Sequence, residues 1–288
     1  MSLPATDDRD TILITGCSSG IGLACAEHLA RRGLRVVAGV RRTEDAERLR
    51  QIASANIEPV LLDVVDADSI RTVATVLEQL VGTRGLAGLV NNAGILIPGP
   101  WELLPTSELR RQFEVNVVGT HAVTQALLPL VRRAAGRIVL MGSISGLVAP
   151  PCYGAYAASK HALEAMADSL RMELRPWKIS VSLVEPDAVG TALWDKLDCG
   201  AAALSRQSAG AAALYDETLR RLRAATVGIR RAALPASAVV GAVEHALLAR
   251  RPKARYAVGW RAKLSLWGAG CLPTALLDQI MLRTTGLS

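Results

Sequence analysis

Tyr156 and Lys160 are four residues apart in the segment YAASK, so a helix would place both side chains on one face. An ordinary tyrosine has a pKa of about 10, which is too high for easy proton exchange near neutral pH. A neighbouring ammonium group favours the phenolate and lowers that pKa. The pair could therefore exchange a proton with a substrate hydroxyl or carbonyl oxygen. Taken alone, a Tyr–x–x–x–Lys pair is more often a contact on a helix surface.

Two other residues bear on this chemistry. Ser143 ends the expected strand RIVLMGS (137–143), where its hydroxyl could donate a hydrogen bond to the same substrate oxygen. Tyr153 has Ala157 four residues later in place of a lysine. We therefore expect Tyr153 to form a wall of the substrate pocket, with simple packing as the alternative.

A glycine-rich turn early in the chain has features of a phosphate-binding loop. The segment TGCSSGIG (15–22) lies between an expected strand and an expected helix. Glycine lets the backbone approach a pyrophosphate, and a helix N-terminus offers free N–H groups. The spacing G-x-x-x-G-x-G differs from the commoner G-x-G-x-x-G, and in isolation it could be an ordinary tight turn. Its position predicts a dinucleotide site formed by Gly16, Ser18, Ser19, Gly20, Ile21 and Gly22.

Residues after the second and third strands indicate which dinucleotide is bound. NAD enzymes often place an acid at the end of the second strand, but here Arg41 and Arg42 follow Val40. Two guanidinium groups suit a ribose 2′-phosphate, so we predict NADP(H) as the cofactor. In the alternative, both arginines are solvated and the enzyme uses NAD. Asp63 could accept a hydrogen bond from the adenine amino group, or cap the following turn.

The chain of 288 residues, half of them apolar, suits one large α/β domain. Short apolar runs alternate with amphipathic stretches. We expect strands at 11–15, 35–40, 58–64, 86–94, 137–143, 178–186 and 254–259. We expect helices at 21–32, 43–54, 68–81 (capped by Asp68), about 107–133, after Tyr153, and 236–250. Continuously apolar strands joined by helices predict a single-domain, Rossmann-type, doubly wound parallel sheet of about seven strands, with helices on both faces. Ligands bind such sheets at the carboxyl ends of the strands.

Two regions depart from this alternation. Residues 192–234 are rich in alanine and could form a substrate lid. The tail 260–288 is apolar, and we expect it to pack against the domain or a second subunit. In the alternative, the tail makes a weak contact with a membrane surface. The chain has no apolar run long enough to cross a bilayer.

Composition excludes several classes of protein. The net charge is +7, but the arginines are spread out and not interleaved with aromatic residues, so nucleic-acid binding is not expected. Five cysteines without a CxxC motif, and four histidines without metal-ligand spacing, predict reduced thiols and no metal site. We expect a cytoplasmic protein. The long helix at 107–133 could pair with its copy in a homodimer or homotetramer.

Together, the motifs resemble the short-chain dehydrogenase/reductase family from about Thr11 to Thr191. They are TGCSSGIG, NNAG (91–94), the asparagine of FEVNVVG, Ser143 and YAASK. The resemblance implies that Tyr156 is the general acid/base, that Lys160 lowers its pKa and binds the nicotinamide ribose, and that Ser143 orients the substrate oxygen. It implies that Asn116 holds a water of the proton relay. The implied cofactor contacts also include Asp63, Val64, Asn92, Ala93, Gly94, Tyr156, Lys160, Pro186, Val189 and Thr191.

One position departs from the family pattern. After the sixth strand the family usually has Pro-Gly, but here the sequence is EPDAVGT, with Asp187 in place of the glycine. Glycine would let the chain pass close to the nicotinamide. Aspartate tolerates unusual backbone angles, so we expect the loop to form and the carboxylate to moderate turnover.

The segment GSISGLVAPPCYGAYAASKHALE and the arginine pair resemble the hydroxysteroid and retinol dehydrogenase branches. We therefore expect an NADP(H)-dependent oxidoreductase that interconverts a secondary alcohol and a ketone on a lipophilic, steroid-, retinoid- or lipid-like substrate. The alternatives are an NAD-dependent dehydrogenase, a nucleotide-binding regulator with weak turnover because of Asp187, and a membrane-surface scaffold. The expected pocket wall comprises Leu147, Val148, Pro150, Cys152, Tyr153, Leu193, Trp194 and Leu197.

Overall fold

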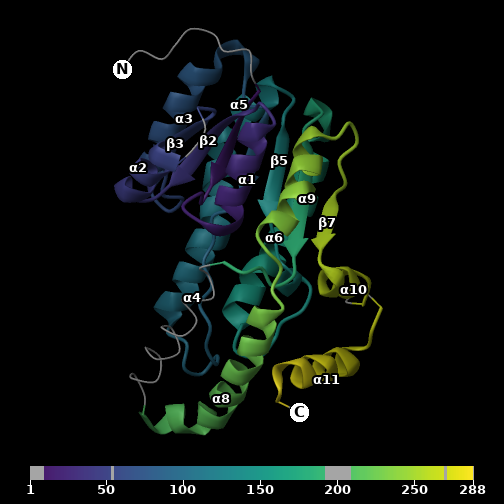
Figure 1. Cartoon of the computed structure of the whole chain (residues 1–288). Coiled ribbons are helices and arrows are strands. Elements are labelled where there is room, and N and C mark those ends of the chain that lie inside the picture. The colour runs from purple at the N-terminus through teal and green to yellow at the C-terminus, as the bar shows by residue number, and fades with distance from the viewer. Residues whose placement is uncertain (1–9, 53–54, 192–208, 269–270, 288) are drawn as a thin grey trace.

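A computed structural model describes residues 10–52, 55–191, 209–268 and 271–287 (Figure 1). Seven strands form one parallel sheet in the order β3-β2-β1-β4-β5-β6-β7. The strands are β1 (Thr11–Thr15), β2 (Arg35–Val40), β3 (Ile57–Leu61), β4 (Gly88–Asn91), β5 (Arg137–Met141), β6 (Ser180–Pro186) and β7 (Arg255–Val258). The strand order reverses between β1 and β4, which is where ligands bind in doubly wound sheets. The predicted fold class is confirmed.

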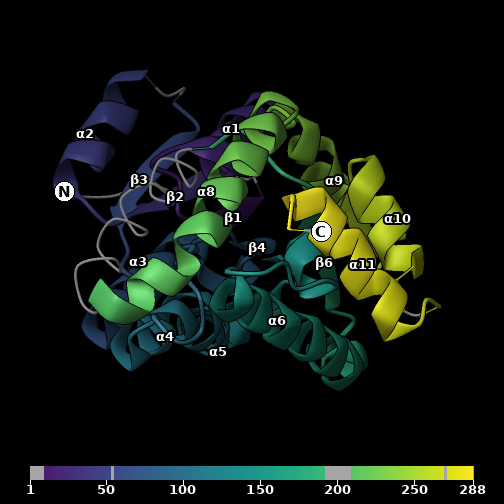
Figure 2. The ribbon, with the colours of Figure 1, turned by 90° about the horizontal axis from the view of Figure 1, so that it is seen from below.

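Helices cover both faces of this sheet (Figures 1 and 2). One face packs against α1 (Gly20–Arg31), α2 (Thr43–Ile52) and α9 (Ser237–Leu248). The other packs against α3 (Ala67–Val81), α5 (Gly119–Arg133) and α6 (Gly154–Glu173). Because both faces are covered, every residue of β1 and β2 is buried, which explains why these strands are apolar without alternation.

The N-terminus of α3 corrects one prediction. Its cap is Asp66, whose Oδ1 accepts hydrogen bonds from the N–H groups of Asp68 (2.9 Å) and Ser69 (3.3 Å). Asp68, the predicted cap, lies inside the first turn. Either aspartate could cap a helix by residue type, and the backbone angles at Asp66 decide between them.

The long helix predicted at about 107–133 is present but interrupted. It consists of α4 (Thr106–Phe113), a π-helical turn η2 (Glu114–Val118) and α5. Such wide turns are frequent at functional sites. This one contains Asn116. The described residues also contain the short 3₁₀ turns η1 (Gly82–Arg84), η3 (Ile144–Gly146) and η4 (Arg175–Trp177).

The helices of the last third of the chain, apart from α9, lie beyond the carboxyl ends of the strands (Figure 1). They are α8 (Ala209–Arg231), α10 (Trp260–Gly268) and α11 (Thr274–Thr285). The C-terminal tail packs against its own domain, because α10 contacts β7 and η3 while α11 contacts α8. Of the predicted lid, 192–208 lie outside the described residues and most of the remainder is α8. Within the described part of the chain, no helix is long and apolar enough to span a membrane.

Candidate active site

A large cleft of about 1240 Å³ lies at the carboxyl ends of the strands. It extends from the turn between β1 and α1, past the ends of β4, β5 and β6, to α8, α10 and α11. Most of the predicted site residues line it. They are Gly16, Ser18, Ser19, Gly20, Ile21, Arg41, Arg42, Asp63, Val64, Asn92, Ala93, Gly94, Ser143, Tyr156, Lys160, Pro186, Val189 and Thr191. Gly22 and Asn116 do not line the cleft.

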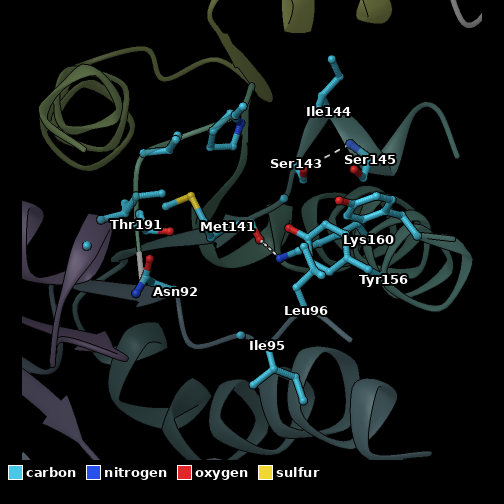
Figure 3. Close-up of a pocket in the computed structure, with 18 of the residues that line it drawn as sticks. Asn92, Ile95, Leu96, Met141, Ser143, Ile144, Ser145, Tyr156, Lys160 and Thr191 are labelled. Atoms are coloured by element: carbon cyan, nitrogen blue, oxygen red, sulfur yellow. Dashed lines mark hydrogen bonds between the residues drawn. The ribbon is translucent and has the colours of Figure 1, made fainter. Parts of the chain in front are cut away.

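Ser143, Tyr156 and Lys160 meet in the middle of this cleft (Figure 3). The first turns of α6 carry Tyr156 and Lys160, which are only 9% and 6% exposed. Lys160 Nζ donates a 2.7 Å hydrogen bond to the carbonyl oxygen of Met141 at the end of β5. The same nitrogen lies 5.6 Å from the centroid of the Tyr156 ring. The Ser143 hydroxyl hydrogen-bonds Tyr156 and accepts a bond from the Ser145 N–H (3.1 Å).

Burial dominates the protonation of this pair. It raises the pKa of Tyr156 to about 12, against a smaller lowering by the hydrogen bond with Ser143. Burial also lowers the pKa of Lys160 to about 8. From the sequence, the ammonium charge of Lys160 alone predicts a lowered pKa for Tyr156. The structure corrects that direction because both groups leave water. At neutral pH Tyr156 is a phenol, ready to donate its proton.

Asn116 lies one layer behind the cleft. It is 1% exposed, and its Oδ1 accepts a bond from the Ile95 N–H (2.8 Å). Its Nδ2 donates to the Ile95 carbonyl (3.0 Å) and to Ser159 Oγ (3.0 Å). The side chain therefore ties the segment after β4 to the catalytic helix. The relay role implied by resemblance stays a prediction.

The glycine-rich turn has the shape that a dinucleotide phosphate requires. Gly16 (φ +73°) and Gly20 (φ +62°) are in the left-handed region. A Cβ on Gly16 would lie 2.9 Å from Ala93 Cα, and one on Gly20 would lie 3.0 Å from Thr191 Cγ2. A Cβ on Gly22 would lie 2.4 Å from the Gly16 carbonyl oxygen. Gly22 therefore lets the helix pack under the turn without itself facing the cleft.

The segment after β4 is braced against this turn. Thr15 Oγ1 accepts hydrogen bonds from the N–H groups of Asn92 (3.0 Å) and Ala93 (2.9 Å). Asn92 Nδ2 donates to the carbonyl oxygens of Thr15 (2.9 Å) and Gly16 (3.1 Å). These bonds hold the backbone at 92–94 along the edge of the cleft, where it fits a flat cofactor.

The arginine pair lies at the rim. Arg41 and Arg42 are exposed, line the cleft, and form no ion pair with any described residue. Asp45, which sequence reasoning missed, also lines the cleft, but its carboxylate is paired with Arg48 at 2.9 Å. Among the described residues neither Arg41 nor Arg42 is paired with an acid, so a phosphate-bearing dinucleotide fits the residues present at this rim.

Comparison with known proteins agrees with this geometry. A family model described as "short chain dehydrogenase" matches residues 10–200. The chain belongs to the short-chain dehydrogenase family. Retinol dehydrogenase 16 of Mus musculus is 37% identical over 291 residues, which cover 95% of this chain and 88% of the relative. The NADPH-dependent 3-dehydrocapnine reductase of Ornithobacterium rhinotracheale is 34% identical over 273 residues, covering 93% and 94%. A solved short-chain dehydrogenase from Streptomyces avermitilis has a TM-score of 0.73 at 28% identity, covering 98% of this chain and 96% of that chain. The predicted family is confirmed, and the retinol dehydrogenase relative agrees with the predicted branch.

This short-chain dehydrogenase accommodates Asp187 without strain. Its φ is not in the left-handed region, and its N–H donates to the Val258 carbonyl oxygen (2.9 Å). Its Oδ1 accepts from the Ala188 N–H (2.8 Å). Gly259 (φ +98°) leaves room for the Asp187 side chain, because a Cβ atom on residue 259 would lie only 2.8 Å from Asp187 Cβ. The loop therefore forms with ordinary angles, whereas the sequence argument relied on aspartate tolerating unusual ones.

The far wall of the cleft, opposite the glycine-rich turn, is the part that was least well predicted from the sequence. Val148, Pro150 and Tyr153 line it as predicted, and Tyr153 Oη lies 3.5 Å from Thr226 Oγ1. Leu147 and Cys152 do not line it, and Leu193, Trp194 and Leu197 lie outside the described residues. The missed residues are Leu222, Ala225, Thr226 and Ile229 of α8; Trp260, Arg261, Leu264 and Ser265 of α10; and Ile280, Met281, Thr284 and Thr285 of α11. In the sequence, these residues show only a helical spacing of apolar positions, which predicts a helix but not its place in the cleft.

Proposed function

We propose that the protein is an NADP(H)-dependent oxidoreductase that interconverts a secondary alcohol and a ketone on a lipophilic substrate. The observation that carries the proposal is the position of the Tyr156, Lys160 and Ser143 side chains. They lie between a glycine-rich dinucleotide turn at one end of the cleft and a largely apolar wall at the other. A proton donor between a nucleotide site and an apolar compartment suits hydride transfer to a lipophilic carbonyl compound.

The residues that would hold the cofactor are those already placed around the turn. The backbone at 16–21 and the N-terminus of α1 suit the pyrophosphate. Asp63, Val64 and the backbone at 92–94 suit the adenosine half, and Lys160 suits the nicotinamide ribose. A bound nicotinamide cofactor supplies or accepts the hydride. Arg41 and Arg42 favour a 2′-phosphate, and the NADPH-dependent relative supports the same preference.

The proton chemistry belongs to Tyr156. In reduction, its phenol gives a proton to the carbonyl oxygen as the carbonyl carbon gains a hydride, and C=O becomes CH–OH. The phenolate left behind is stabilised by the Ser143 hydrogen bond and by the Lys160 ammonium. In oxidation, the phenolate takes the alcohol proton. Because burial raises the pKa of Tyr156 to about 12, the phenol is the resting form at neutral pH, which is the form that the reductive direction uses.

The substrate class follows from the far wall. Its apolar members include Val148, Pro150, Leu222, Ile229 and Leu264. These five side chains have no hydrogen-bonding group, and a steroid-, retinoid- or lipid-like molecule would bury its carbon skeleton against them. The similarity to a retinol dehydrogenase supports this class. Cytoplasmic location and a homo-oligomer stay predictions from the sequence.

The test measures oxidation of NADPH and NADH in parallel, by absorbance at the reduced-nicotinamide band, with a panel of steroid, retinoid and long-chain carbonyl compounds. We expect kcat/KM with NADPH to exceed that with NADH by at least tenfold. The double variant Arg41→Ala/Arg42→Ala should lose this preference. Arg50→Ala is the matched control, because Arg50 is exposed on α2 but does not line the cleft. Faster oxidation of NADH by the unmodified protein would refute the cofactor assignment.

A further inference from the structure

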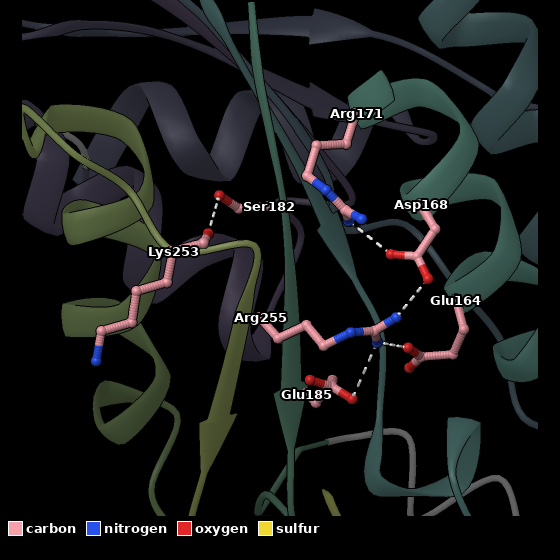
Figure 4. Close-up of polar contacts among 7 residues, drawn as sticks. All are labelled: Glu164, Asp168, Arg171, Ser182, Glu185, Lys253 and Arg255. Atoms are coloured by element: carbon pink, nitrogen blue, oxygen red, sulfur yellow. Dashed lines mark hydrogen bonds and ion pairs between the residues drawn. The ribbon is translucent and has the colours of Figure 1, made fainter. Parts of the chain in front are cut away.

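An ionic cluster that is buried at Glu185 and Glu164 and exposed at Asp168 lies beside the catalytic helix, outside the cleft (Figure 4). Glu164 and Asp168 come from α6, Glu185 from β6 and Arg255 from β7. The Glu185 and Glu164 side chains are 0% and 13% exposed, and that of Arg255 is 27% exposed. Burying charge is costly unless the groups are paired, so this arrangement needs a physical reason.

Arg255 is the centre of the cluster. Its Nη1 donates to Glu164 Oε2, and its Nη2 donates to Asp168 Oδ2 at 2.8 Å. Glu185 Oε1 lies 3.7 Å from the same Nη1, which is within ion-pair range but too long for a hydrogen bond. The Arg255 guanidinium, from the edge strand β7, thus extends past β6 and forms hydrogen bonds with two consecutive turns of α6.

Glu164 and Glu185 lie close to residues of the candidate active site. Glu164 is one turn beyond Lys160 and two turns beyond Tyr156 on the same helix face. Its Oε1 lies 2.7 Å from the position that a Cβ on Gly146 would take, so it packs against the turn that follows Ser143. Glu185 immediately precedes Pro186, which lines the cleft. Arg255 therefore contacts side chains from the helix and the strand end that bear on the chemistry.

We propose that Arg255 is a positioning residue for the reaction: its guanidinium fixes the helix of Tyr156 and Lys160 against the turn of Ser143 and the end of β6. This inference rests on the proposed function for its kinetic consequence, but its structural consequence can be measured without catalysis. Arg255 touches none of the reacting groups and acts through Glu164 and Asp168 of α6.

Glu185 fits this arrangement as a neutral acid. Neither of its carboxyl oxygens has a hydrogen-bond partner among the described residues, and the same holds for the buried Glu164 Oε1. Burial, followed by repulsion from Asp168, raises the pKa of Glu185 to about 7. The charged groups that face it are Glu164 and Asp168 of α6, with Arg171 paired to Asp168 (2.6 Å), and Arg255 of β7. With Glu185 protonated, two carboxylates balance two guanidinium groups.

The test compares Arg255→Gln with Arg35→Gln. Arg35 is a matched control because its buried guanidinium also joins neighbouring strands, through Glu58 at 2.6 Å, but at the end of the sheet opposite the cleft. For Arg255→Gln we expect kcat to fall at least tenfold, KM for NADPH to change less than threefold, and Arg255→Lys to recover part of kcat. Arg35→Gln should keep kcat within twofold. Equal kcat for Arg255→Gln and the unmodified protein would overturn the proposal.

Hydrogen exchange of the cofactor-free proteins provides the second measurement. Arg255→Gln should accelerate exchange at 143–147 and 154–168, and leave 11–31 unchanged. Unchanged exchange at 143–168 would also overturn the proposal. If Arg255→Gln does not fold, Arg255→Met/Glu164→Met removes both charges together and should fold with the same loss of kcat. A chain that reduces no carbonyl compound, yet shows the predicted exchange, would refute the proposed function and leave the positioning role intact.

Discussion

Replacing Glu185 by glutamine should stabilise the protein at alkaline pH but much less at pH 5. Burial raises the pKa of this carboxyl from 4.5 to about 7. The folded state therefore holds the proton more tightly than the unfolded state, and stability is lost as the pH rises towards and through 7. Each pKa unit corresponds to about 1.4 kcal/mol, so ionised Glu185 costs about 3 kcal/mol above pH 8. Glutamine cannot ionise, so the variant avoids this cost at every pH.

Urea unfolding of both proteins at pH 5 and pH 8.5, followed by tryptophan fluorescence, measures this effect. The gain in free energy of unfolding from Glu185→Gln should be larger at pH 8.5 than at pH 5 by about 2–3 kcal/mol. Glu217→Gln is the control: its carboxyl pKa is lowered by Arg220 and Arg221, so it is ionised at both pH values and its effect should not change. A gain from Glu185→Gln that is the same at both pH values would refute the reasoning.

Two further predictions concern the cleft. Asp187→Gly should tighten NADPH binding and raise kcat severalfold, because it removes a carboxylate that lines the cleft; unchanged values in a fluorescence titration and steady-state assay would show that the position is inert. Lys160→Met should lower kcat at least a hundredfold yet raise the thermal midpoint at pH 7. Burial lowers the pKa of this ammonium to about 8. Below that pH the buried charge destabilises the folded state, and this destabilisation is lost as the pH rises through 8. A thermal midpoint below that of the unmodified protein at pH 7 would contradict this account.

The parts of the site that could be predicted from the sequence depend on local signals. Continuously apolar runs that alternate with amphipathic stretches located the strands, and the turn at 15–22 combines glycine spacing with a strand before and a helix after it. Tyr156 and Lys160 are close in sequence, so helix geometry alone placed them together. The same reasoning located Arg41 and Arg42, because they follow a strand whose end is well marked.

The remaining parts depend on tertiary packing. Arg255 pairs with Glu164 across 91 residues, and no local pattern encodes that contact. The pKa of Tyr156 moves opposite to the sequence-based expectation because burial is a property of the whole fold. The far wall comes from α8, α10 and α11, whose apolar residues line a shared cleft only after the chain has folded back over the strand ends.

The central claim is that Tyr156 is the proton donor, and single-turnover reduction of a lipophilic ketone by NADPH tests it most directly. We expect Tyr156→Phe to slow the chemical step by about 10²–10⁴-fold, which is the usual contribution of a general acid, while the dissociation constant for NADPH changes less than threefold. Tyr153→Phe, which removes the hydroxyl of the neighbouring pocket-wall tyrosine, should slow that step less than threefold. A Tyr156→Phe protein that reduces the ketone at the unmodified rate would contradict the account.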